Sequence, residues 1–271
     1  MKAAVLGSPI GHSLSPVLHR AAYQALGLAG WSYEAIECDE AHLPALLAGC
    51  GPDWAGLSLT MPLKRAVLPL LDSLDPLGAA VGAANTIVFA AGQRHGHNTD
   101  VPGMIAALTE GGVTGPPTAV LILGGGATAC SALAAVRGLG ATQATAAVRD
   151  PARAADLLAA GRRLGVAVTL IPFDQPAVSA PGLLISTVPA GAANFYAERL
   201  SRGDLVPAHL LDVVYHPWPT ALACAARRAG VVVVGGFPML LHQAAGQVAL
   251  MTGRQAPVEA MRAAGLATLG A

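Results

Sequence analysis

The chain has 271 residues, of which 54% are apolar and 12% are charged, with 16 Lys plus Arg balanced by 16 Asp plus Glu. This length allows one large or two modest domains, and the apolar content excludes an intrinsically disordered chain. Because the formal net charge is zero, the sequence offers no basic surface for nucleic acid or an anionic membrane, and we expect neither as a partner. Any anion that the protein binds must therefore be held by a local site.

Signals for metal, compartment and membrane are weak. The eight histidines show no HExxH spacing, so no metal site is predicted. The N-terminus reaches Gly7 before an apolar signal core is complete, which predicts a cytoplasmic protein. Prolines and three glycines interrupt the uncharged stretch 111–136, which predicts a loop, a strand and a turn instead of a membrane helix. We expect free thiols, because the four cysteines form no metal-binding pattern: Cys38, Cys50, Cys130 and Cys224.

Residues 1–100 alternate between strand and helix patterns, and a hairpin pattern closes them. The predicted strands are Lys2–Leu6, Ser32–Cys38, Leu57–Thr60, Asn85–Phe89 and Arg94–Asn98. The predicted helices are Ser15–Leu26, Glu40–Ala48 and Leu63–Leu71. A domain boundary is expected near residues 100–103, and the pattern on each side predicts the α/β class.

After that boundary, short apolar runs alternate with alanine-rich helices, as in a parallel sheet covered on both faces. The predicted strands are Ala119–Leu123, Gln143–Val148, Val166–Ile171, Leu183–Thr187, Leu210–Val214 and Val231–Val234. Helices are predicted at 151–164 and 220–229, and again after Gly235-Gly236 at 239–252 and 258–266. The pattern leaves open which half the last two helices pack against.

A glycine motif directly follows the strand that ends at Leu123. It fits the G-x-G-x-x-G/A form of a dinucleotide-binding turn in the expected strand-to-helix context. Glycines permit the tight turn and a close approach to a pyrophosphate, and the helix N-terminus offers free amides to the anion. The residues predicted to bind the cofactor here are Gly124, Gly125, Gly126, Ala127, Thr128 and Ala129.

The end of the second strand in this half bears on the choice of cofactor. An NAD site would place a carboxylate there for the ribose, whereas this chain has Arg149 first and Arg153 four residues later. Two cations favour a 2′-phosphate, so NADP is predicted over NAD. Asp150 has two interpretations at this stage, as a helix cap before Pro151 or as a ribose ligand.

Small polar residues gather at predicted strand ends in the first half. Ser13 and Ser15 flank the start of a helix, where they would cap it or hold a small anion. Thr60 and Lys64 follow a strand that ends before a proline, at the carboxyl edge where open sheets bind ligands. If Asp100 meets Lys64, the pair would supply a proton donor and acceptor for a reacting oxygen, but spacing alone does not show that they meet.

Seven stretches, in order along the whole chain, together resemble the shikimate dehydrogenase family. They are Gly7-Ser8-Pro9-Ile10 with Ser13-x-Ser15-Pro16, Thr60-Met61-Pro62-Leu63-Lys64, Gly82-Ala83-Ala84-Asn85-Thr86, Asn98-Thr99-Asp100, the turn at Gly124, Asp212-Val213-Val214-Tyr215-x-Pro217, and Gly235-Gly236 leading to Met239-Leu240 and Gln243-Ala244. The resemblance implies two α/β domains, one for substrate (1–100 plus 237–271) and a Rossmann-type NADP domain (101–236). It therefore places the last helices on the substrate domain.

The resemblance also implies a reaction and roles for individual residues. The reaction is the reversible reduction of 3-dehydroshikimate to shikimate with NADPH, on the route to aromatic amino acids. Lys64 and Asp100 would form the catalytic pair, and Gly236 would join the cofactor site. The substrate carboxylate would bind Ser13, Ser15 and Tyr215, and the ring hydroxyls would bind Thr60, Lys64, Asn85, Asp100 and Gln243.

Some positions depart from the common family pattern. Ser58 stands where Asn is frequent, Val101 replaces a glycine, and Asp150 adjoins Arg149 in the cofactor loop. Two other functions therefore stay open: a quinate/shikimate dehydrogenase that uses NAD, and a catalytically inactive homologue that senses a ligand. A homodimer is an assembly that the sequence leaves open.

Overall fold

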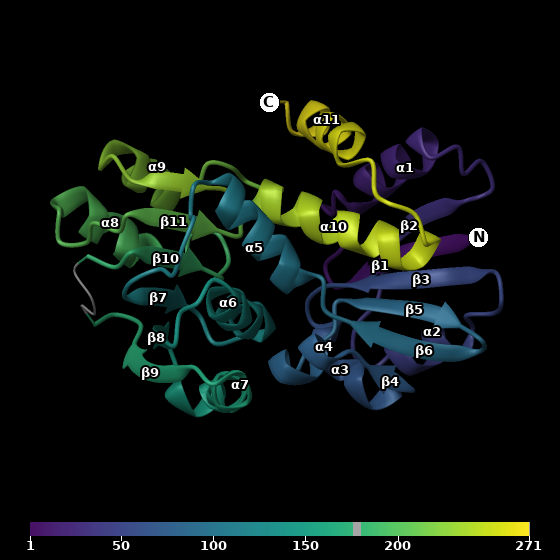
Figure 1. Ribbon diagram of the computed structural model, residues 1–271, viewed down its shortest axis with the longest axis horizontal. Coiled ribbons are helices and arrows are strands. Elements are labelled where there is room, and N and C mark those ends of the chain that lie inside the picture. The colour runs from purple at the N-terminus through teal and green to yellow at the C-terminus, as the bar shows by residue number, and fades with distance from the viewer. Residues whose placement is uncertain (176–179, 271) are drawn as a thin grey trace. The chain divides into compact units, whose positions relative to one another are not determined.

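The computed structural model describes residues 1–175 and 180–270 (Figure 1). The chain divides into two compact units, which are described separately below. Unit 1 comprises Met1–Gly103 and Leu240–Ala271, and unit 2 comprises Met104–Met239. Helices α5 (Asp100–Glu110) and α10 (Gly236–Thr252) contain the two points at which the chain changes unit.

Unit 1 holds a six-stranded mixed sheet with the order β2-β1-β3-β5-β6-β4. Its strands are β1 (Lys2–Gly7), β2 (Ser32–Glu37), β3 (Trp54–Leu59), β4 (Ser73–Leu74), β5 (Thr86–Ala90) and β6 (Gln93–His97). β1 pairs in parallel with β2 and β3, whereas β5 runs antiparallel to β3 and β6. The carboxyl ends of β1, β3 and β6 and the amino end of β5 therefore lie at one edge of the sheet.

The two faces of this sheet are covered differently, because successive side chains of a strand point to opposite faces. Leu57 and Leu59 of β3 join an apolar cluster with residues of α2 (Leu43–Ala48) and α3 (Leu63–Ala66). Ser58, between them, is hydrogen-bonded instead to Gln247 of α10. Leu57 and Leu59 therefore face an apolar cluster, whereas Ser58 on the other face contacts a buried polar group.

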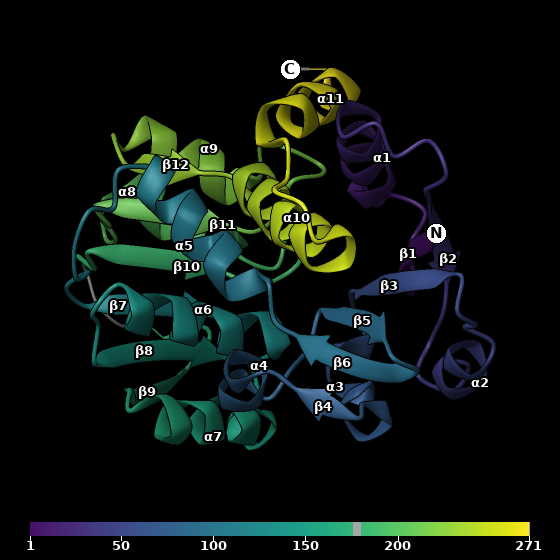
Figure 2. The same cartoon turned by 45° about the vertical axis from the view of Figure 1, so that its right-hand side comes forward.

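The C-terminal helices complete unit 1. α11 (Val258–Leu269) packs on α1 (Ser15–Ala25), although the two are far apart in the sequence, and both views show them side by side (Figures 1 and 2). α10 approaches β3 closely, since a Cβ added at Gly56 would lie 2.8 Å from Cγ of Met251. A short helix, α4 (Pro76–Val81), precedes β5 and is capped by Asp75, whose Oδ1 accepts from the Gly78 amide at 2.6 Å.

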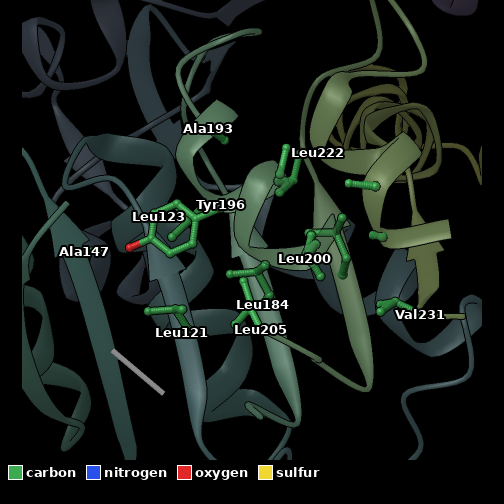
Figure 3. Packing of buried hydrophobic residues seen from close by; sticks show 14 residues of the cluster. Leu121, Leu123, Ala147, Leu184, Ala193, Tyr196, Leu200, Leu205, Leu222 and Val231 are labelled. Atoms are coloured by element: carbon green, nitrogen blue, oxygen red, sulfur yellow. The ribbon is translucent and has the colours of Figure 1, made fainter. Parts of the chain in front are cut away.

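Unit 2 holds a second six-stranded sheet, with the order β12-β11-β10-β7-β8-β9 and parallel pairing throughout the described strands. Its strands are β7 (Val120–Leu123), β8 (Gln143–Val148), β9 (Ala167–Pro172), β10 (Leu183–Ser186), β11 (His209–Asp212) and β12 (Val232–Val234). Helix α6 (Ala127–Gly138) packs on α7 (Ala155–Leu164), and α8 (Asn194–Arg202) packs on α9 (Ala221–Arg228). Figure 3 shows the apolar cluster in which Tyr196 and Leu200 of α8 meet Leu121, Leu123 and Leu184 of the sheet.

The predicted α/β class with two sheets is confirmed, and the differences from the predicted elements are local. α4, α8 and the two-residue strand β4 are absent from the prediction, and α5 begins where only a domain junction was expected. Pro102 lies in the first turn of α5, where a proline costs no helical hydrogen bond. The predicted helix 63–71 stops at Ala66 and continues as a 3-10 turn, Leu68–Leu70, because Pro69 interrupts it.

Candidate functional site

The polar residues that the sequence singled out in the first half reach one edge of the unit 1 sheet. The loop with Ser13 and Ser15 follows β1, and Thr60 follows β3, its neighbour. Asn85 immediately precedes β5, and Asp100 comes three residues after β6. Sheet topology alone therefore brings together side chains from four separate segments.

Lys64 and Asp100 meet at this edge. Lys64 Nζ donates to Asp100 Oδ2 at 2.6 Å, and the two side chains are only 15% and 4% exposed. Lys64 sits on α3, and its carbonyl accepts from the Ala84 amide at 2.9 Å, which ties the helix to the start of β5. A buried ion pair needs further hydrogen bonds to offset the loss of solvation, and the neighbours of Asp100 provide them.

Asn85 is the centre of those hydrogen bonds and is 1% exposed. Its Nδ2 lies 2.8 Å from Asp100 Oδ1, 2.9 Å from Thr99 Oγ1 and 3.2 Å from Gln243 Oε1. Its Oδ1 accepts from the Thr99 amide at 2.8 Å and from Thr86 Oγ1 at 2.9 Å. Both oxygens of Asp100 are thus engaged, one by Lys64 and the other by Asn85, which fixes the carboxylate plane.

Gln243 reaches this cluster because α10 lies close to the first turn of α5. A Cβ added at Gly103 would lie 2.8 Å from Gln243 Cβ and 2.9 Å from its backbone nitrogen, so a glycine is required for this approach. Gln243 Nε2 donates to the Leu240 carbonyl at 2.9 Å, which leaves its Oε1 facing Asn85.

The serine loop does not cap α1 with the Ser15 side chain, so that interpretation is wrong. Leu14 occupies the cap position with no side-chain hydrogen bond, and Ser15 is already the first helical residue. Ser13 Oγ accepts from the Ser15 amide at 3.3 Å. Ser15 is buried, with 5% of its surface exposed. The side chain of Thr60, which follows the neighbouring strand, packs against Gly7 at the end of β1.

In unit 2, the glycine turn lies at the point where the strand order reverses. β7 is flanked by β8 on one side and by β10 on the other, and ligands of such sheets bind outside the carboxyl ends at this position. Gly124 has φ +112°, and a Cβ there would lie 2.6 Å from Thr187 Oγ1, just after β10. Gly126 starts α6 without a side-chain cap, and a Cβ there would meet nothing within 4 Å. An open, uncapped helix N-terminus fits a pyrophosphate.

In the loop after β8, Asp150 makes the capping contact that the sequence suggested. Asp150 Oδ1 accepts from the Ala152 amide at 2.9 Å and begins a 3-10 turn, Pro151–Ala154, before α7. Arg149 is exposed at the end of β8. The side chain of Arg153 lies outside the described residues.

Tyr215, a predicted substrate ligand, and Gly236, a predicted cofactor residue, also belong to unit 2. The other seven predicted substrate ligands belong to unit 1. Tyr215 is half-buried in the loop after β11. Asp212 holds that loop, since it accepts from Thr220 Oγ1 at 2.6 Å and from the Val214 amide at 3.3 Å, and burial raises its pKa. The Gly236 amide donates to the Val214 carbonyl at 3.2 Å.

A buried polar group behind the site, formed by His19, Tyr33, Ser58 and Gln247, was not predicted from the sequence. Tyr33 Oη donates to Ser58 Oγ at 2.6 Å, and Ser58 Oγ donates to Gln247 Oε1 at 2.8 Å. The one available signal was the spacing of Gln247, four residues after Gln243 on the same helix.

Among residues 1–175 and 180–270, no three His, Cys, Asp or Glu side chains are grouped as metal ligands. Within the same ranges, no helix combines the length and apolarity needed to cross a bilayer. None of Cys38, Cys50, Cys130 and Cys224 forms a disulfide within the described residues, and burial raises the pKa of Cys38 and Cys50.

Comparison with known proteins agrees with the resemblance seen in the sequence. Residues 5–87 match the family model described as the shikimate dehydrogenase substrate binding domain, and residues 236–264 match the shikimate 5'-dehydrogenase C-terminal domain. A shikimate dehydrogenase (NADP(+)) of Moorella thermoacetica is 34% identical over 95% of this chain and 90% of its own length. The chain belongs to the shikimate dehydrogenase family.

Solved structures of family members share the whole fold. The crystal structure of Mycobacterium tuberculosis shikimate dehydrogenase has a TM-score of 0.88 and 45% identity, covering 98% of this chain and 99% of that one. The enzyme of Thermus thermophilus, solved in complex with NADP(H) and shikimate, has a TM-score of 0.85 and 33% identity, covering 99% and 100%. The family fold therefore extends over both units.

Proposed function

We propose that the protein is an NADP-dependent oxidoreductase that reversibly reduces 3-dehydroshikimate to shikimate, on the route to aromatic amino acids. The observation that carries the proposal is the Lys64–Asp100 pair, joined at 2.6 Å and held by Asn85, in a chain of this family. Retention of both the ammonium and its carboxylate partner counts against a catalytically inactive homologue. A cytoplasmic location and a homodimer stay predictions.

Lys64 carries the chemistry at the substrate oxygen. The bound cofactor supplies a hydride to the ketone carbon, so negative charge develops on the ketone oxygen. Asp100 engages one of the three N–H donors of Lys64, and another is free to donate to that oxygen and to pass it a proton. Asp100 keeps the ammonium in place and, with Asn85 holding its second oxygen, orients a substrate hydroxyl.

The remaining ligands bind the ends of the substrate. Ser13, Ser15 and Tyr215 take the carboxylate, which hydroxyl donors at a helix start can hold without a neighbouring cation. Thr60, Asn85 and Gln243 take the ring hydroxyls together with Lys64 and Asp100. Both amide side chains are already oriented by each other at 3.2 Å, which lowers the entropy cost of binding.

The uncapped turn from Gly124 to Ala129 would hold the pyrophosphate of a dinucleotide, and Gly236 would join the cofactor site. We infer that NADP is preferred over NAD, because Asp150 is engaged in capping and Arg149 is exposed beside it. Arg149 and Arg153 would read the 2′-phosphate. A carboxylate that held the ribose hydroxyls would favour NAD, and one oxygen of Asp150 is already taken by the capping hydrogen bond.

Initial rates test the proposed reaction with both acids, shikimate and quinate, and with both cofactors, followed at the NADPH absorbance band. We expect the highest kcat/KM with shikimate and NADP. A preference for quinate with NAD would support the first alternative, and no turnover with any combination would support a ligand-sensing protein. Either result would refute the proposal.

Variants assign the roles, with a matched control for each. Lys64→Ala should reduce kcat by several orders of magnitude with a much smaller change in affinity. The control is Lys2→Ala, which removes another ion-paired lysine, 2.8 Å from Asp53, away from the site. Arg149→Ala should weaken NADP much more than NAD, and Arg162→Ala on α7 should change neither. Normal turnover of Lys64→Ala, or an equal loss for both cofactors in Arg149→Ala, would remove the assigned role.

A further inference from the structure

Gln247 lies behind the site, and its side-chain amide makes four hydrogen-bond contacts. It lies on α10 and is 1% exposed. Its Nε2 donates to the Asn85 backbone carbonyl at 3.2 Å and to Thr86 Oγ1 at 3.1 Å. Its Oε1 lies 2.8 Å from Ser58 Oγ and 3.3 Å from His19 Nε2. Two donated and two accepted hydrogen bonds saturate one amide group.

The donor and acceptor of each of these hydrogen bonds follow from the Asn85 carbonyl oxygen, which can only accept. The amide of Gln247 must therefore turn its nitrogen toward β5 and its oxygen toward Ser58 and His19. Ser58 then gives its single hydrogen to Gln247 and accepts from the Tyr33 hydroxyl. His19 must carry its hydrogen on Nε2. A different amide orientation would leave several buried groups without partners.

Gln247 reaches Asn85 by two routes. The first is the direct bond to the Asn85 carbonyl. The second passes through Thr86, whose hydroxyl accepts from Gln247 and donates to Asn85 Oδ1 at 2.9 Å. One turn earlier on the same helix, Gln243 Oε1 accepts from Asn85 Nδ2. The backbone and side chain of Asn85 are thus held from α10, and Asn85 in turn holds Asp100.

We propose that Gln247 is a positioning residue for the reaction: it fixes Asn85, and through Asn85 it fixes the Asp100 carboxylate that holds the Lys64 ammonium. This inference rests on the proposed function, since it assigns Gln247 to the same catalytic pair. A fixed carboxylate matters because misplacing a reacting group by about 1 Å can cost roughly 100-fold in rate. Gln247 therefore contributes to the rate of the reaction as well as to the stability of the fold.

The test is Gln247→Met, which keeps the length of the side chain and removes all four hydrogen bonds. We expect kcat/KM for shikimate to fall about 10-fold, the loss produced by roughly 1.4 kcal/mol in the barrier. The KM for NADP should change less than about twofold, because the predicted cofactor residues lie in unit 2. Should this variant fail to fold, Gln247→Asn keeps the amide but is one methylene shorter, and the same result is expected from it.

The matched control is Tyr23→Phe, which removes a buried hydroxyl that contacts His19 and, in the part of the chain that the structure describes, makes no hydrogen bond to Gln247. Tyr23 Oη lies 3.5 Å from His19 Nδ1, and the residue is 3% exposed. This variant should lower Tm but leave kcat/KM within about twofold of the wild type. A purely structural role of Gln247 would give its variants the same behaviour as this control.

A second arm repeats Gln247→Met in an Asn85→Ala background. Because Gln247 acts through Asn85, the further loss in kcat/KM should be less than about twofold there. A full 10-fold loss in that background, or a folded Gln247→Met enzyme with normal kcat/KM, would overturn the inference while the proposed function stands. A wild-type protein without activity on shikimate would overturn both, so the two failures are distinguishable.

Discussion

His19 should make the free energy of unfolding depend on pH. The side chain is completely buried on α1 and stacks on Tyr33, with ring centroids 3.9 Å apart. Burial lowers the pKa of His19 to about 3, and the hydrogen bond to Gln247 opposes that shift only in part. The folded protein therefore keeps His19 neutral at pH values where an unfolded chain would protonate it.

The sign and size follow from the difference between the two states. Between pH 6.5, the ordinary value, and about 3, the unfolded chain binds one more proton than the folded chain. The contribution of His19 to stability is complete above pH 6.5 and is lost as the pH falls toward 3. The slope is about 1.4 kcal/mol per pH unit, so moving from pH 7 to pH 5 should cost roughly 2 kcal/mol from this group alone.

Urea denaturation of the wild type and of His19→Gln at several pH values from 7 to 5 measures this effect. The glutamine retains a polar amide but does not titrate, so the variant should lose about 2 kcal/mol less than the wild type over that range. His12→Gln, at an exposed histidine, should follow the wild type. Parallel curves for the wild type and His19→Gln would refute the reasoning that His19 is neutral because it is buried.

Three further substitutions test local features of the fold. Asp75→Ala removes the oxygen that accepts from the Gly78 amide at 2.6 Å, and thermal denaturation should show a loss of about 1 kcal/mol; an unchanged Tm would contradict the cap. Gly103→Ala brings a Cβ to within 2.8 Å of Gln243, so calorimetry should show a loss of roughly 1–3 kcal/mol in the free energy of unfolding. Rate assays should show a lower kcat. Wild-type values of both would contradict the close approach. Tyr196 Oη has no hydrogen-bond partner among the described residues, and burial raises the pKa of Tyr196 to about 12. Tyr196→Phe should leave the unfolding free energy unchanged or raise it by up to about 1 kcal/mol, and a clear loss in urea denaturation would reveal a partner.

The alternation of strands and helices, and the polar residues at the strand ends, could be predicted from the sequence alone. The strand Gln143–Val148 has the predicted bounds, and the glycine turn follows β7 as expected. Lys64 and Asp100 stood out because each follows a predicted strand, where open sheets bind their ligands. These features depend on backbone preferences and on side-chain periodicity over a few residues, and both can be recognised in the sequence itself.

Spatial convergence, by contrast, depended on the order and direction of strands. Lys64 and Asp100 meet across 36 positions, and His19 meets Gln247 across 228. No local pattern specifies those contacts, because they arise only once β5 pairs antiparallel with β3 and α10 crosses that face of the sheet. The amino-acid sequence therefore determined which chemical groups the protein has and which elements carry them. Tertiary structure decided which groups touch, since burial and hydrogen bonding act between segments that only the assembled sheet brings within reach.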